Sequence, residues 1–272
     1  MRQAQGFTLF ELVLVMVLLG ITLVGASRVV RAFSDIYQQQ SNQDQLVSQS
    51  RFVLERLTRE LRDVTPNSVR LNTAAGVQCL EFVPFSVSGR YRAITLSPDS
   101  RSFLDVISLD SNFSVQANQY LVVYPTQVSD IYSSSAQRVQ LAATPLGNDG
   151  DGESATYRLQ LASASSFGRG SPAQRYYLLQ NPVSYCVQAG QLWRYQGYSL
   201  QSTQPMPGSG LSGGSVMATG VVNNVSSQPV FAIAAASLQR NAMINIWLRF
   251  ASSNDSATVL SFHHIVQVQN VP

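Results

Sequence analysis

Lysine is absent from this 272-residue chain, so all 18 of its basic side chains are arginines. The absence excludes Schiff-base catalysis by lysine and every phosphate-binding loop of the P-loop type. Histidine is almost absent as well: His263 and His264 are adjacent in a strand-like run, where consecutive side chains point to opposite faces. With only two cysteines, the sequence assembles no zinc site and no cysteine–histidine nucleophile pair. We therefore predict that the chain is not an enzyme and needs no cofactor.

Charge is also scarce. Charged residues make up 12% of the chain, about half of the roughly 25% that is usual for soluble domains. The formal net charge is only +3, which is too small for a surface that follows a phosphate backbone. We expect no nucleic-acid partner. The length and the hydrophobic fraction of 45% allow one large domain or two small ones.

The N-terminus contains a long apolar run, from Phe7 to Val30, in which Glu11 is the only acid. No charge occurs from Leu12 to Ser27. As a helix this charge-free part rises about 24 Å, and the residues before it extend it toward the roughly 30 Å of a bilayer's hydrocarbon. The run therefore predicts a single membrane anchor.

Two simpler interpretations of this run are a secretory signal peptide cut before Ser27 and a plain membrane anchor. Glu11 argues against the signal peptide, because a carboxylate at membrane depth costs at least about 2.5 to 3.5 kcal/mol and is usually retained for a partner or a function. A plain anchor gives no reason for the Gly-Phe-Thr-Leu sequence at 6–9.

The sequence Gly-Phe-Thr-Leu-Phe-Glu-Leu at 6–12, followed by the apolar run, resembles the prepilin signature of type IV pilins and pseudopilins. In that family a prepilin peptidase cuts after the glycine and methylates the new amino terminus. The resemblance implies a leader peptide at 1–6, cleavage between Gly6 and Phe7, and N-methylation of Phe7. Gln5 departs from the family pattern, which usually has Lys or Arg there, and Phe10 replaces a branched aliphatic residue.

The resemblance also implies a role for Glu11 in assembly, since its carboxylate would meet the cationic amino terminus of a neighbouring subunit. The implied partners are prepilin peptidase, other major and minor pilins, and the inner-membrane assembly platform. The implied location is the bacterial inner membrane, with a single pass at 7–30, a cytoplasmic N-terminus and a periplasmic head, and then the pilus surface.

Helical spacing of apolar residues continues beyond the anchor. Ile36, Val47, Leu54, Leu57, Leu61 and Val64 follow a 3-4 repeat, which predicts an amphipathic helix over 31–66 that ends at Pro66. Its apolar stripe after Leu46 should pack on a sheet. We expect an α+β, type IV pilin-like fold in which the long N-terminal helix packs on a β-rich head at 67–272.

The rest of the chain contains short runs of strand-forming residues separated by turn formers, which predict a mainly antiparallel sheet. Ala189-Gly190 predicts a tight hairpin, and 201–214 predicts a flexible surface loop rather than a domain boundary. The expected strands are 77–84, 91–96, 103–109, 120–124, 139–142, 156–161, 175–179, 183–187, 192–195, 230–234, 243–250 and 259–268.

The two cysteines, Cys79 and Cys186, lie in separate strand-like runs. An anchored chain of this orientation places its head outside the cytoplasm, where disulfides persist, so we expect a Cys79–Cys186 disulfide. Two buried free thiols are the alternative.

Two other features have weaker functional interpretations. Asp149, Asp151 and Glu153 lie in a Gly-rich loop that partly resembles a calcium loop, but the full ligand spacing is absent and a solvated turn is favoured. The aromatic pairs Tyr176-Tyr177 and Trp193/Tyr195 could bind a glycan or a partner pilin, although aromatic residues at this spacing usually pack within a sheet.

Further segments narrow the resemblance. The sequences at 175–179, 182–186 and 192–195 are similar to a segment shared by J-type pseudopilins of type II secretion and MshO-type minor pilins of the mannose-sensitive haemagglutinin (MSHA) pilus. The sequences at 79–82 and 268–272 resemble the MshO type more closely. We therefore expect an MSHA-type minor pilin. The alternatives are a J-type pseudopilin, a membrane-anchored periplasmic glycan-binding module and a membrane-anchored enzyme.

Overall fold

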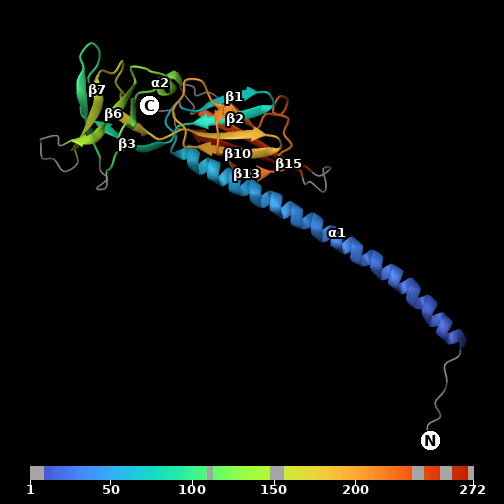
Figure 1. Cartoon of the computed structure of the whole chain (residues 1–272). Helices are drawn as coiled ribbons and strands as arrows, with labels where there is room; N and C mark the ends of the chain where they lie inside the picture. Colours follow the sequence, from blue (N-terminus) through green and yellow to red (C-terminus); the bar gives the residue numbers. More distant parts are fainter. Residues whose placement is uncertain (1–8, 109–112, 148–155, 235–241, 252–258, 269–272) are drawn as a thin grey trace, which may run out of the picture.

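The computed structural model describes residues 9–108, 113–147, 156–234, 242–251 and 259–268. Its dominant element is helix α1 (Leu9–Arg62), which projects from one side of a β-rich head (Figure 1). The helix is uninterrupted because no proline occurs before Pro66. Its 54 residues correspond to a length of about 81 Å. Beyond the helix, Thr65 N donates to Val83 O at 2.9 Å, which ties the chain to the sheet.

Only the C-terminal part of α1 packs against the head. Val53, Leu57 and Leu61 are fully buried there. The stripe after Leu46 packs on the head as predicted, whereas Ile36, earlier in the helical repeat, is 59% exposed. The reason is that the helix reaches the head only from about residue 42, where its side chains first become partly covered. The apolar residues before that point continue the exposed surface of the projecting half.

Two sheets and α1 enclose the first core, and the helix contacts β13, β15 and β16. The five-stranded sheet has the order β1-β2-β9-β10-β13 and the three-stranded sheet the order β14-β15-β16, both antiparallel throughout. The strands are β1 (Arg70–Ala74), β2 (Val77–Phe82), β9 (Val183–Gln188), β10 (Gln191–Gln196), β13 (Ser215–Thr219), β14 (Phe231–Ala234), β15 (Ala242–Ala251) and β16 (Val259–Val268).

The chain between β2 and β9 forms a closed six-stranded antiparallel barrel with a core of its own (Figure 1). The barrel order is β3-β4-β7-β6-β5-β8, and the short helix α2 (Ser129–Tyr132) precedes β6. Its strands are β3 (Phe85–Tyr91), β4 (Arg101–Ile107), β5 (Tyr120–Val123), β6 (Arg138–Gly147), β7 (Thr156–Ser165) and β8 (Arg175–Leu179). Because β2 pairs with β9 and β3 pairs with β8, the chain enters and leaves the barrel through adjacent strands.

The expected α+β fold with a long N-terminal helix on antiparallel sheet is confirmed. The hairpin is confirmed too: Ala189 and Gly190 have φ values of 47° and 72°, as a type I′ turn requires. The strand predicted over 91–96 is wrong, because β3 ends at Tyr91. Strands β1, β3 and β13 were missed, since polar and glycine residues interrupt their apolar pattern. The loop at 201–214 contains two two-residue strands, β11 (Met206–Pro207) and β12 (Gly210–Leu211).

Candidate functional site

The projecting half of α1 is the largest exposed apolar surface in the described part of the chain. Every residue from Leu9 to Ser41 is exposed, and an 18-residue window in this half has a mean hydropathy of 2.5 with none of it buried. Covering a large apolar side chain contributes about 1.5 to 3 kcal/mol. Such a helix is therefore far more stable in lipid, or packed on neighbouring helices, than in water.

Glu11 lies in the first turn of this helix and is exposed. The first turn favours a carboxylate, because the backbone N–H groups there carry partial positive charge. No other charged residue occurs in the helix before Arg28. The pairing of Glu11 with a neighbour's amino terminus stays a prediction, and Gly6 and Phe7 lie outside the described residues.

The predicted acidic loop with Asp149, Asp151 and Glu153 also lies outside the described residues. Within the described residues, no group of three or more His, Cys, Asp and Glu side chains could hold a metal ion. The two histidines are on opposite faces of β16. His263 stacks on Trp247 with ring centroids 4.8 Å apart, while His264 Nε2 lies 3.0 Å from Thr58 Oγ1 of α1.

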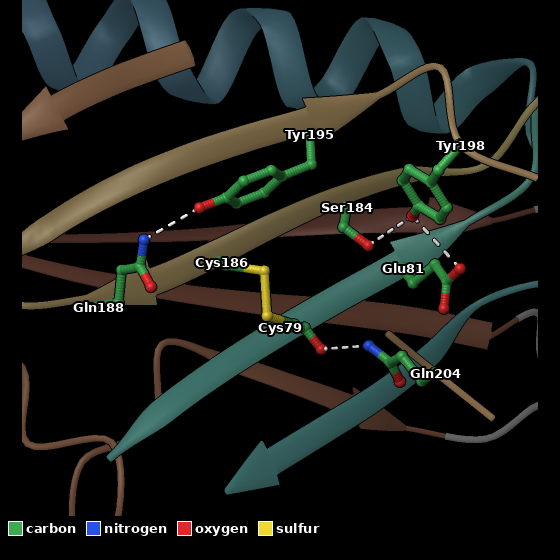
Figure 2. The surroundings of a disulfide bond; sticks show 8 residues. All are labelled: Cys79, Glu81, Ser184, Cys186, Gln188, Tyr195, Tyr198 and Gln204. Atoms are coloured by element: carbon green, nitrogen blue, oxygen red, sulfur yellow. Dashed lines mark hydrogen bonds between the residues drawn. A yellow bond between two sulfur atoms is a disulfide. The ribbon is translucent and has the colours of Figure 1, made fainter. Parts of the chain in front are cut away.

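Cys79 of β2 and Cys186 of β9 are register partners in adjacent strands and form a disulfide (Figure 2). The bond fits the expectation from the sequence. It belongs to a small cluster with Tyr195 and Leu211, separate from the core under α1. Gln204 Nε2 donates to the carbonyl oxygen of Cys79 at 2.9 Å (Figure 2), which holds the loop at 201–214 over this cluster. Cys79 and Cys186 are 107 residues apart in the sequence. The disulfide joins β2, which leads into the barrel, to β9, which follows it.

The aromatic pairs take part in packing. Tyr176 is fully buried in the barrel core, and Tyr177 is 6% exposed on the opposite face of β8. Trp193 and Tyr195 stack with centroids 6.4 Å apart in the disulfide cluster. Burial raises the pKa of Tyr176 well above its usual value. Three of these residues are buried and Trp193 is half-buried, so they contribute mainly to the packing of the head.

Sequence reasoning missed an ion pair centred on Glu81, whose side chain is fully buried. Arg70 Nε lies 2.6 Å from Glu81 Oε2, and the hydroxyl of Tyr198 donates to Glu81 Oε1 at 3.2 Å (Figure 2). The Arg70 guanidinium also stacks on the ring of Tyr132, 3.6 Å from its centroid, at the end of α2. Burial raises the pKa of Glu81, and the contact with Arg70 only partly opposes this shift. The pair thus links the five-stranded sheet to the barrel.

A second group of charges connects α1 to the same sheet. Glu60 accepts hydrogen bonds from Arg194 Nε at 3.0 Å, Arg56 Nε at 3.1 Å and the Tyr185 hydroxyl at 3.1 Å. The sequence gives one signal for it, the i,i+4 spacing of Arg56 and Glu60. Its partners on β9 and β10 are more than a hundred residues away and have no local signal.

Comparison with protein-family models finds one match, the prokaryotic N-terminal methylation motif, over residues 1–27. Neither the curated proteins nor the solved structures contain a match. The matched residues cover the Gly6–Leu12 signature and most of the apolar run. The motif therefore supports a relationship to type IV pilins and pseudopilins, processing by prepilin peptidase, and a structural rather than enzymatic role. Together with the exposed apolar helix, it fits anchoring in the inner membrane.

Proposed function

We propose that this chain is a minor pilin of an MSHA-type type IV pilus, which prepilin peptidase cuts between Gly6 and Phe7 and which is then built into, or primes, the filament tip. One observation carries the proposal. The methylation motif at 1–27 extends into a helix whose first half is apolar, exposed and long enough to span a membrane. That combination suits a subunit that waits in a bilayer and then packs its helix on neighbouring helices.

Assembly would use Glu11. In the low dielectric of a membrane or a helical bundle, a lone carboxylate is unfavourable, whereas a carboxylate that meets a cationic amino terminus gains a charge-assisted hydrogen bond. Cleavage after Gly6 creates such an amino terminus at Phe7. The apolar helix surface then supplies the association energy, and the Glu11 contact fixes the register of one subunit against the next.

The head would stay in the periplasm and later on the filament surface. Val53, Leu57 and Leu61 bury α1 in the core of the head, so the projecting half is rigidly continuous with it. Extraction of the helix from the membrane therefore moves the head along with it. A disulfide such as Cys79–Cys186 is suited to an oxidising compartment.

The choice of an MSHA-type pilus rests on the similarity at 79–82 and 268–272. The segments at 175–179, 182–186 and 192–195 support a J-type pseudopilin of type II secretion as the second candidate. The two functions predict different phenotypes. Deleting the gene in its native host should remove pili and leave secretion unaffected, whereas normal piliation with failed secretion would favour the pseudopilin.

Mass spectrometry of the intact protein and its N-terminal peptide, from membranes of the native host, tests the processing step directly. We expect a mature chain that begins at N-methylated Phe7. A chain that begins at Ser27 would identify a cleaved secretory signal peptide, and the proposal would then be wrong.

Replacing Glu11 by alanine tests the assembly step. The Glu11→Ala variant should insert into the membrane as the wild type does but fail to enter filaments, because the contact that fixes its register is lost. Glu55→Ala is the matched control, since Glu55 is an exposed acid on the head-bound half of the same helix. Membrane fractionation and immunoblotting of sheared filaments measure both steps. Normal incorporation of Glu11→Ala would refute the pairing role.

A further inference from the structure

A cleft lies where the C-terminal end of α1 meets the junction between the five-stranded sheet and the barrel. Its volume is about 810 Å³, within the range of about 300 to 1,000 Å³ that is usual for small-molecule sites. Glu60 of α1 and Asp63, directly after the helix, form one part of its wall. The start of β3 and the loop at 116–120 form another, and the end of β10 a third. The cleft therefore lies beside the C-terminal end of α1, the end farthest from the membrane-anchoring half.

Three charged residues line the cleft. Glu60 and Arg194 are paired with each other, and Asp63 is exposed. Glu60 accepts from Arg194 Nε at 3.0 Å, and Arg194 Nη1 donates to Gln196 Oε1 at 2.5 Å. An anion would have to displace Glu60 from Arg194 and would be repelled by the Asp63 carboxylate. That exposed carboxylate can accept hydrogen bonds from the hydroxyl groups of a neutral ligand. The electrostatics therefore disfavour an anionic ligand and suit a neutral one that donates hydrogen bonds.

Amide side chains dominate the polar lining of the cleft. Each amide offers both hydrogen-bond donors and an acceptor, so one amide can serve two neighbouring hydroxyl groups that donate and accept. Phe85 and Tyr120 add aromatic surface, against which the C–H face of a sugar ring can pack. The six amides are Gln116, Asn118, Gln119, Gln180, Asn181 and Gln196. Gln119 already uses its amide inside the head, where it donates to Ser86 Oγ and Leu179 O and accepts from Gln116 N, and Gln196 Oε1 accepts from Arg194. The exposed amides that a ligand can reach are therefore Gln116, Asn118, Gln180 and Asn181.

The rim is held in place by the barrel. Asn118 has a φ of 58°. Its backbone N–H donates to Ala142 O at 3.3 Å, and its backbone carbonyl oxygen accepts from Gln140 Nε2 at 3.2 Å. Gln180 N donates to Pro84 O at 2.8 Å. These backbone bonds fix the rim before any ligand arrives, which lowers the entropy that binding must overcome.

We propose that this cleft binds a neutral oligosaccharide. The ligand class follows from the paired charges, the abundance of amides and the two aromatic rings, and the site is distinct from the aromatic pairs at 176–177 and 193–195. The inference goes beyond the role in assembly, which depends on the opposite end of α1. The cleft would give the exposed head a carbohydrate-recognition surface.

The test uses the full chain in a polyoxyethylene detergent, because maltoside headgroups would compete for the site. The probes are an array of neutral, sialylated and sulfated oligosaccharides and an array of peptides. The best neutral oligosaccharide is then titrated by calorimetry. We expect binding to neutral oligosaccharides. Binding confined to acidic glycans or to peptides would overturn the proposal, as would the absence of any binding.

A triple variant, Gln116→Ala, Gln180→Ala and Asn181→Ala, removes three exposed rim amides and should weaken binding about tenfold or more. The matched control, Gln39→Ala, Gln40→Ala and Gln267→Ala, removes three exposed amides elsewhere and should bind as the wild type does. Equal affinity of the rim variant and the wild type would refute the site.

A second variant, Ala117→Trp, fills the cleft from its exposed rim and should abolish binding without removing a hydrogen-bonding side chain. Retained affinity in this variant would also refute the site. N-methylation of Phe7 and incorporation into filaments should stay normal in the rim variant and in Ala117→Trp, which separates a failure of the cleft proposal from a failure of the assembly proposal.

Discussion

Replacing both Cys79 and Cys186 by alanine should lower the free energy of unfolding by an amount that reveals how the barrel and the sheets unfold. The disulfide closes a separation of 107 residues. If the whole head unfolds in one step, the chain-entropy relation gives a loss of about 4.8 kcal/mol. If the barrel stays folded while the sheets unfold, the flexible part of the loop is only about 13 residues, and the loss falls to about 3 kcal/mol.

The difference arises because β3 and β8 are paired. As long as the barrel is folded, this pairing holds the two ends of the inserted segment together, so the disulfide restricts only the short segments between the barrel and the two cysteines. Only when the barrel unfolds does the disulfide constrain the full loop. The measured loss therefore distinguishes one cooperative transition from two.

Guanidinium unfolding of the detergent-solubilised full chain measures this loss. Trp193 in β10 and Trp247 in β15 both belong to the sheets, so their fluorescence follows the sheets rather than the barrel. Far-ultraviolet circular dichroism follows the barrel and the sheets together with α1, and the denaturant slope scales with the surface exposed. Chemically reduced wild-type protein is the control, since it keeps both sulfur atoms and separates the effect of the bond from that of packing. A loss below about 1 kcal/mol would refute the argument.

Two further predictions concern single residues. Leu57→Ala should lower the free energy of unfolding by about 2 to 5 kcal/mol, because a fully buried side chain leaves a cavity between α1 and the sheets. The exposed neighbour variant Arg59→Ala should change it by less than about 0.5 kcal/mol, and equal effects in denaturant titrations would contradict the packing of α1. Burial raises the folded-state pKa of Glu81 above its unfolded value of 4.5, so the folded state binds the extra proton between the two values. As pH rises from 4.5 through the folded pKa, the wild type should lose stability relative to Glu81→Gln, and a relative gain over that interval would be the contrary result.

Local sequence was sufficient to predict the helix, the motif at its start and most strands. Helix α1 follows from a long stretch without proline and with apolar residues at helical spacing. Strands β8 and β16 match their predicted bounds, because alternation and flanking turn formers define them locally. The Ala189-Gly190 hairpin was predictable for the same reason, since a two-residue turn with positive φ fixes the register of its two strands.

The paired charges needed the tertiary structure. Arg70 and Glu81 are register partners in the β1–β2 hairpin, but β1 was not predicted from the sequence, and Tyr132 reaches Arg70 from α2. Glu60 and Arg194 are far apart in the chain. A buried charge is stabilised only when its partner arrives from elsewhere, so the sequence of one strand cannot indicate whether its single acid is buried or solvated.

Local sequence patterns are enough to locate the apolar segments, the helical and extended segments, and the motif for prepilin processing. They do not reveal that the segment between β2 and β9 closes into a barrel, that α1 completes the core of the two sheets, or that a cleft forms where α1, the five-stranded sheet and the barrel meet. The physical reason is that periodicity records which face of a segment is apolar but not which distant segment covers that face. Strand order and closure depend on contacts between residues far apart in the chain, and these form only when the whole head is folded.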